Sequence, residues 1–100
     1  MNNTENEKLQ ELFRSAPFIA DLGMELGSLG AGQCITSLTI ESRHLQQNGF
    51  VHAGVLAAMA DHSAGAAAFT LVGEGSYVLT AEFKVSLLRA ARGERLRCQS

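Results

Sequence analysis

One hundred residues with a formal net charge of −2 at pH 7 make one small domain. A charge this close to neutral gives no electrostatic footprint for nucleic acid or for an anionic membrane. The N-terminal stretch is polar and lacks the apolar run of a secretory signal. We therefore expect a cytoplasmic protein that binds neither nucleic acid nor membrane.

The first elements are predicted from apolar spacing. Leu9, Leu12 and Phe13 recur at helical spacing within residues 5–15, which predicts a short amphipathic helix. Pro17 is expected to end this helix or to follow its end.

Two strands are predicted next, over residues 23–29 and 33–41. The intervening Gly-Ala-Gly is typical of a hairpin turn. In the second strand Cys34 begins an alternating set of apolar and small side chains that share one face. Cys34 and Cys98 form no CxxC pair, so we expect them to be reduced packing residues.

Residues 53–71 are apolar nearly all round and predict a central, buried helix. The run has the length of a membrane span, but Asp61 and His62 at its centre and its Ala and Gly content argue against one. The glycines at 73 and 75 are expected to break the helix.

Residues 76–88 alternate between apolar and polar side chains and predict a long strand. After a turn at residues 92–94, another strand is expected to start at Arg95. The order of elements indicates an α+β fold, with an antiparallel sheet packed against one central helix.

A pattern of polar and small residues surrounds the start and middle of the central helix. Its members are Asn48, Gly49, His52, Ala53, Gly54, Asp61 and the run from Ser63 to Ala67. This pattern resembles the signature of hotdog-fold acyl-CoA thioesterases, most closely the phenylacetate-degradation (PaaI-like) type. Residues 80–89 are similar to that family's long strand after the helix.

The resemblance runs from about Leu22 to Ser100 and implies a hotdog fold, an antiparallel sheet wrapped around one long central helix. Residues 1–100 are then one hotdog domain, with 1–16 as an N-terminal helical segment. Members usually continue for two further strands. The last strands are therefore expected to be missing and the C-terminal end to be truncated.

Gly54 and Asp61 carry the chemistry that we expect. They are seven residues apart, so they share a helix face about 10 Å apart along the axis. The unpaired N–H groups at a helix N-terminus can polarise a thioester carbonyl and stabilise an oxyanion. A carboxylate can activate water as a general base, or attack directly to give an anhydride.

The resemblance extends this to a set of candidate site residues. The catalytic candidates are Asp61, Gly54, His52 and Asn48, and the substrate-binding candidates are Gly49, Val55, Thr80, Phe83 and Arg89. The resemblance also implies an acyl-CoA substrate, no cofactor beyond the coenzyme A of that substrate, and a site shared by two subunits. A homodimer is expected, with a dimer of dimers as the alternative.

Each candidate also has a purely structural interpretation. Ser63 or His62 could satisfy a buried Asp61, and His52 and Asn48 could brace the loop. Thr80 and Phe83 could be ordinary strand residues, and Arg89 with Arg92 an exposed, solvated pair.

The histidines outside this set receive structural roles. His62, about 100° from Asp61 around the helix, is expected to be a packing or interface residue, and His44 is expected to be solvated. The three histidines lack metal-ligand spacing, which predicts no metal site.

Thioester hydrolysis is the leading function. The alternatives are an acyl-CoA-binding module without catalysis, and a hydratase or dehydratase of the same fold.

Overall fold

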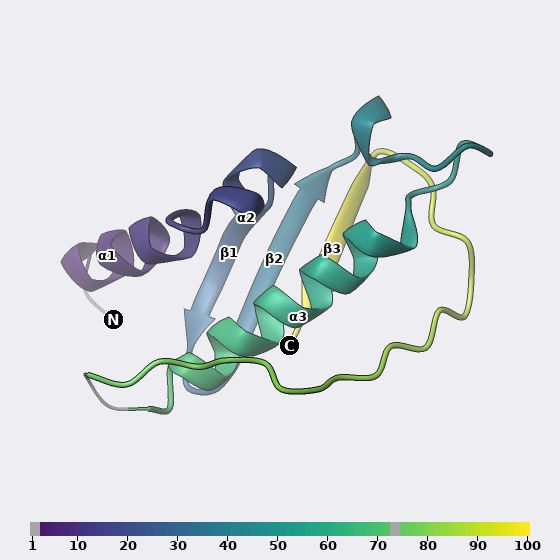
Figure 1. The fold of residues 1–100 in the computed structure, drawn as a ribbon. Coiled ribbons are helices and arrows are strands. Elements are labelled where there is room, and N and C mark those ends of the chain that lie inside the picture. The colour runs from purple at the N-terminus through teal and green to yellow at the C-terminus, as the bar shows by residue number, and fades with distance from the viewer. Residues whose placement is uncertain (1–2, 73–74) are drawn as a thin grey trace.

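The computed structural model describes residues 3–72 and 75–100, so Gly73 and Glu74 of the expected helix break lie outside it. The elements in chain order are α1 (Asn3–Arg14), α2 (Pro17–Leu22), β1 (Glu25–Gly30), β2 (Gln33–Thr39), the 3-10 helix η1 (Ser42–His44), α3 (Ala53–Phe69) and β3 (Arg95–Gln99). The strands form an antiparallel sheet in the order β1-β2-β3. Helix α3 lies across one face of this sheet (Figure 1), so the predicted α+β arrangement is confirmed.

The hairpin between β1 and β2 depends on the backbone freedom of small residues. Its two turn residues, Ala31 and Gly32, have positive φ angles of 52° and 77°, as a type I′ turn requires. A β-bulge interrupts β1 between Leu26 and Ser28. At Gly27 a Cβ would lie 3.1 Å from the carbonyl oxygen of Ile35, so the bulge accepts only glycine without a shift of β2.

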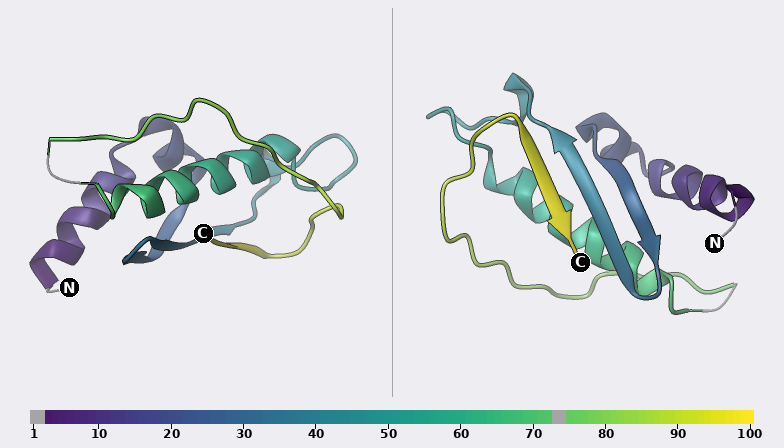
Figure 2. Two further views of the ribbon diagram at one scale, coloured as in Figure 1. Left: turned by 90° about the horizontal axis from the view of Figure 1, so that it is seen from below. Right: turned by 180° about the vertical axis from the view of Figure 1, so that it is seen from behind.

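The core lies between α3 and the sheet (Figure 2). Its buried apolar members are Phe13, Ile19, Met24, Leu26, Cys34, Leu38, Val51, Val55, Met59 and Ala67. Thr36 of β2 and Ser63 of α3 are also fully buried, and their hydroxyls are hydrogen-bonded to each other at 2.7 Å. This bond satisfies both polar groups and fixes the helix against the central strand. In the described residues, no helix has the length and apolarity needed to cross a membrane.

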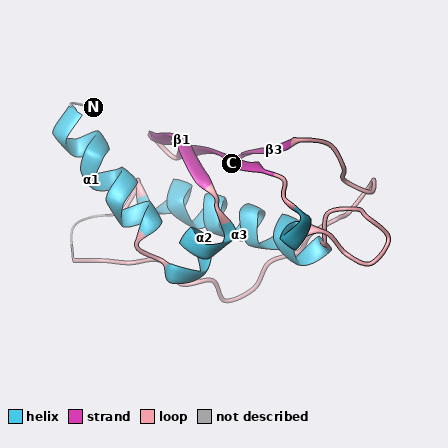
Figure 3. Cartoon of the chain, turned by 90° about the horizontal axis from the view of Figure 1, so that it is seen from above, coloured by secondary structure: helices cyan, strands magenta, loops and turns pink. Residues whose placement is uncertain are grey.

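Helix α2 was not predicted. Pro17 occupies the first turn of this six-residue helix, where its missing N–H costs no hydrogen bond. Gly23 ends the helix in the left-handed conformation, with φ of 87°. Helix α2 lies on the same side of the sheet as α3 (Figure 3), and it buries Ile19 in the core.

The predicted strand over residues 76–88 is wrong for the single chain. These residues are extended but belong to no described strand, and their side chains are exposed. They run from the end of α3 and bow outward around the helix before β3 begins (Figure 2). The physical reason is that a strand needs a hydrogen-bonded neighbour, and the described part of one chain offers none beside this segment.

His44 is buried, with 1% of its surface exposed, so the expectation of a solvated side chain is wrong. Its Nδ1 accepts a hydrogen bond from the Glu41 N–H at 2.9 Å, and its Nε2 lies 2.7 Å from the Leu22 carbonyl oxygen. Because Nδ1 is an acceptor, Nε2 carries the proton and donates to Leu22. The imidazole thereby ties η1 to the end of α2.

Candidate active site

His52 caps the N-terminus of α3. Its Nδ1 accepts a hydrogen bond from the Gly54 N–H at 2.8 Å, which satisfies one of the unpaired donors of the first turn. A Cβ at Gly54 would lie 3.0 Å from that same nitrogen. The expected oxyanion donor is therefore hydrogen-bonded to His52 in this structure.

The loop before the helix is organised by Gln46, which the sequence analysis did not single out. The Gln46 Oε1 accepts hydrogen bonds from the backbone N–H groups of Asn48 and Phe50. Gly49 is in the left-handed region with φ of 86°, which closes the turn. The side chain of Asn48 is exposed on this loop. Val55, the residue that follows Gly54 in α3, is buried in the core.

Asp61 lies two turns after Gly54 on α3. The Thr80 hydroxyl donates a hydrogen bond to the Asp61 Oδ1 at 2.7 Å, so two candidate residues that are 19 positions apart meet. Ser63 does not satisfy this carboxylate, because its hydroxyl pairs with Thr36. Within the described residues, Oδ2 of Asp61 has no protein donor, which leaves it for a water molecule or a substrate.

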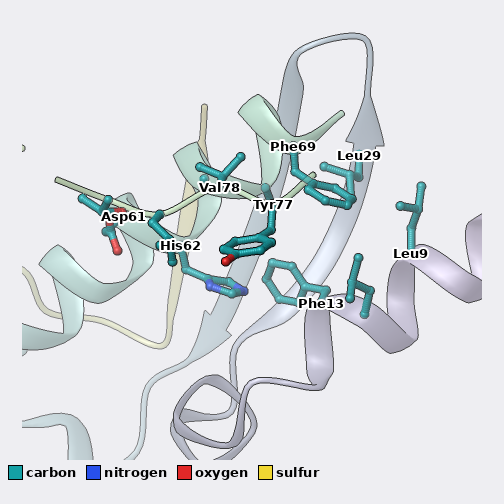
Figure 4. Close-up of a pocket in the computed structure, with 13 residues that line it drawn as sticks. Leu9, Phe13, Leu29, Asp61, His62, Phe69, Tyr77 and Val78 are labelled. Carbon is teal, nitrogen blue, oxygen red and sulfur yellow. The ribbon is translucent and has the colours of Figure 1, made fainter. Parts of the chain in front are cut away.

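A cavity of about 420 Å³ opens beside Asp61 (Figure 4). Its lining is mostly apolar and comes from α1, β1, α3 and the extended segment: Leu9, Leu12, Phe13, Leu29, Asp61, His62, Gly65, Ala66, Phe69, Tyr77, Val78, Leu79 and Thr80. A space of this size, with few polar groups, is typical of a small-molecule site.

His62 borders the same cavity as Asp61, a role that the sequence analysis did not foresee. Its ring meets Phe13 edge-on, with ring centroids 4.6 Å apart and an interplanar angle of 67°. Burial lowers the pKa of His62, and the Phe13 backbone and the Asp61 carboxylate partly oppose that shift. The sequence alone does not indicate that His62 borders this cavity, because the cavity forms only where α1 packs against α3.

The remaining candidates lie apart from this cavity. Phe83, 51% exposed, lines a second and more open depression that Asp61 also borders. Arg89 is exposed beside Arg92 and borders neither of these two spaces. Across residues 3–72 and 75–100, no three His, Cys, Asp or Glu side chains gather as a metal site would require.

Comparison with known proteins found a matching family and similar solved structures. Residues 48–100 match the family described as the Thioesterase superfamily. A thioesterase family protein from Silicibacter pomeroyi has a TM-score of 0.88 and 36% identity, over 94% of this chain and 69% of its own. A Haemophilus influenzae thioesterase has a TM-score of 0.82 and 25% identity, over 93% of this chain and 64% of its own.

A mutant of the phenylacetic acid degradation protein PaaI from Thermus thermophilus is also similar. Its TM-score is 0.70 at 26% identity, over 83% of this chain and 70% of its own. A search of curated proteins found no match. These structural likenesses confirm the predicted hotdog fold, and the chain spans about two thirds of the proteins that it resembles.

Proposed function

The chain belongs to the thioesterase superfamily, and from this premise we propose that it hydrolyses acyl-CoA thioesters. One observation carries the proposal: Asp61, a carboxylate on a largely apolar helix, is hydrogen-bonded to Thr80 at the edge of an apolar cavity. The bond to Thr80 holds one carboxylate oxygen, and the other accepts no hydrogen bond from the described residues.

In the proposed reaction Asp61 takes a proton from water, and the water oxygen attacks the thioester carbon. The carbon–sulfur bond then breaks, and the proton passes to the departing coenzyme A thiolate. A direct attack by Asp61, giving an anhydride that water cleaves, is the alternative within the same proposal. The reaction needs no cofactor, because coenzyme A is part of the substrate.

The Gly54 amide is the proposed oxyanion donor, released when His52 turns away. In one chain Gly54 and Asp61 are about 10 Å apart along the helix, too far to act on one carbonyl carbon. We therefore place Asp61 of one subunit opposite Gly54 of another, in a homodimer that could pair further into a dimer of dimers. Asn48 and Gly49 lie in the loop beside Gly54 and are proposed to contact the coenzyme A side of the substrate.

The finer assignment follows the likeness to PaaI. We propose a PaaI-like enzyme of the cytoplasm that acts on a small or aryl acyl group. Thr80 holds the carboxylate, Phe83 lines the second depression that Asp61 borders, and Arg89 is proposed to meet the coenzyme A phosphates. Val55, buried in the core, is proposed to support the start of α3 behind Gly54.

The deciding variant is Asp61→Asn, which keeps the shape of the side chain and removes its basic oxygen. We expect thiol release from a panel of acyl-CoAs to fall at least ~100-fold, the usual contribution of a general base. Asp21→Asn, at an exposed carboxylate on α2, is the matched control and should keep the wild-type rate. A folded Asp61→Asn protein with undiminished turnover would return Asp61 to a structural role.

A further inference from the structure

Strand β3 has an open edge. Among the described residues the sheet has the order β1-β2-β3, so β3 is paired with β2 alone. Cys34 and Ser100 exchange both of their backbone hydrogen bonds at 2.8 Å, and in an antiparallel pair such bonded residues alternate along the strand. Arg95, Arg97 and Gln99 therefore direct their backbone N–H and C=O groups away from β2. A row of unpaired backbone groups is a template for another strand.

Helix α3 has apolar surface beside this edge that the sheet does not cover. The sheet-facing residues of α3 are buried, but the residues one position further along, about 100° round the helix, remain partly or fully accessible. We call these residues the apolar strip: Ala60, Ala64, Ala68 and, just after the helix, Leu71.

The apolar strip borders a space of about 630 Å³. This space reaches from Ser100, the residue after β3, to residues 83–85 of the extended segment. In the view from behind, α3 is visible between β3 and the extended segment (Figure 2). A strand added to β3 would continue the sheet beneath the apolar strip and bury it.

Basic residues are concentrated in the segment that leads into β3. Arg95 and Arg97 project from the face of β3 opposite α3, where Arg95 donates a hydrogen bond to the Ser37 hydroxyl at 2.7 Å. Neither arginine forms an ion pair with a carboxylate of the described residues. In the sequence, Glu94 is the only acidic residue between positions 84 and 97. Five of the eight Lys and Arg residues of the chain lie in that stretch: Lys84, Arg89, Arg92, Arg95 and Arg97.

We propose that the open edge of β3 binds an extended acidic peptide of a partner protein, which adds a fourth strand to the sheet. Alternate side chains of a strand point to opposite faces. The inward side chains of the peptide are apolar and cover the apolar strip, and the outward ones are acidic and lie beside Arg95 and Arg97. Backbone pairing supplies affinity, and the side chains supply specificity. The inference does not rest on the proposed hydrolysis, because no part of it uses the Asp61 carboxylate.

Two blocked peptides of about nine residues, a usual strand length, test the pairing by fluorescence anisotropy. One alternates Glu with Val and the other alternates Lys with Val, and each is used at a concentration at which it stays monomeric. We expect the wild type to bind the Glu–Val peptide at least about tenfold more tightly, because like charges on neighbouring strands repel. Equal binding of the two peptides, or no binding of either, would overturn the proposal.

Charge reversal on the protein locates the preference. Arg95→Glu combined with Arg97→Glu should make the chain prefer the Lys–Val peptide. The matched control is Lys8→Glu combined with Arg14→Glu, at two exposed residues of α1, which changes the net charge by the same amount and should keep the wild-type preference. A preference that reversed in the control as well would reflect overall charge and would refute docking at β3.

Hydrogen exchange and a broken peptide backbone test whether the contact is a strand pair. With the Glu–Val peptide bound, the amides of Arg95, Arg97 and Gln99 should exchange more slowly, whereas those of Leu96 and Cys98, which point to β2, should change little. A central Pro-Pro in the peptide removes at least one donor to β3, because successive N–H groups alternate in direction. This peptide should bind about tenfold more weakly. Undiminished binding, or protection at other amides only, would contradict strand addition.

Sedimentation velocity separates a peptide partner from a second copy of the chain. The protein should keep its oligomeric state when the Glu–Val peptide is bound. If the peptide instead dissociates a dimer, the edge of β3 is the surface through which two copies pair, and the proposal is wrong.

Discussion

Position 54 favours glycine because the His52 ring lies close to it, and not because of its backbone conformation. A Cβ there would meet the His52 ring at 3.0 Å, so any side chain disturbs the cap and the approach to the amide. We expect Gly54→Val to lower kcat about 10²–10³-fold, the usual cost of one lost oxyanion donor. Gly54→Ala should be affected less, because it adds only the Cβ.

Thiol release from one acyl-CoA, measured alongside thermal unfolding, checks this order. If Gly54→Val folds and turns over at the wild-type rate, the N-terminus of α3 is not part of the active site. A rate that fell only because the protein unfolded would appear in the thermal scan.

Cys34 gives the fold a dependence on alkaline pH. Burial, the larger cause, and the nearby Cys98 thiol raise the pKa of the Cys34 thiol to about 11. Because the folded pKa lies above the unfolded value of about 8.5, folding favours the neutral thiol. Its contribution to stability is complete below about pH 8.5 and is lost as pH rises through the folded pKa.

Denaturant unfolding at pH 8 and at pH 10.5 measures this dependence. We expect the wild type to lose more stability between these pH values than Cys34→Ala, although the variant starts less stable because it lacks a core side chain. Equal losses in the two proteins would show that Cys34 does not link folding to pH.

At the level of elements, the fit of α3 to the sheet depends on one buried polar pair. Ser63→Ala would leave the Thr36 hydroxyl buried without a partner, and we expect a loss of about 1–3 kcal/mol in the free energy of unfolding. Thr36→Val combined with Ser63→Ala removes both polar groups and should recover part of this loss. A double variant less stable than the sum of the single changes would contradict this account.

The elements that the sequence predicts best are those with the strongest local pattern. The apolar run predicted a helix over residues 53–71, and α3 spans Ala53–Phe69. Helix α2 has only six residues, too few for a helical period to stand out. Residues 76–88 have the alternation of a strand, but pairing depends on a neighbour that local sequence does not specify.

The candidate site likewise contains residues that the sequence could indicate and contacts that it could not. Asp61 and Gly54 could be proposed from residue type and spacing, because each suits a step of thioester chemistry, whereas Thr80 was proposed only through the family resemblance. The His52 cap on Gly54 and the meeting of Phe13 with His62 could not be predicted. Those contacts depend on side-chain rotamers and on how α1 packs against α3, which no periodicity encodes.

At the scale of the whole molecule, the extended segment of residues 76–88 has no strand paired with it in the single chain. Its apolar side chains are largely exposed, with Tyr77 at 77%, Leu79 at 79% and Leu87 at 54%. An unpaired, apolar, extended segment is a template for pairing with another chain. A 100-residue domain also has only a modest core, so burial of this surface between two copies would add stability.

We therefore expect an obligate dimer in which residues 76–88 of two copies pair edge to edge and the two α3 helices pack together. Sedimentation velocity should show a dimer for the wild type, and Leu79→Glu with Phe83→Glu should dissociate it, because each charge would be buried at the new interface. Phe18→Glu is the matched control: Phe18 is 64% exposed but lies on α2, so the dimer should persist. A stable, folded and active wild-type monomer would refute both the pairing and the placement of Gly54 and Asp61 in different subunits. If Phe18→Glu alone dissociated the dimer, the interface would be formed by α2 and not by residues 76–88.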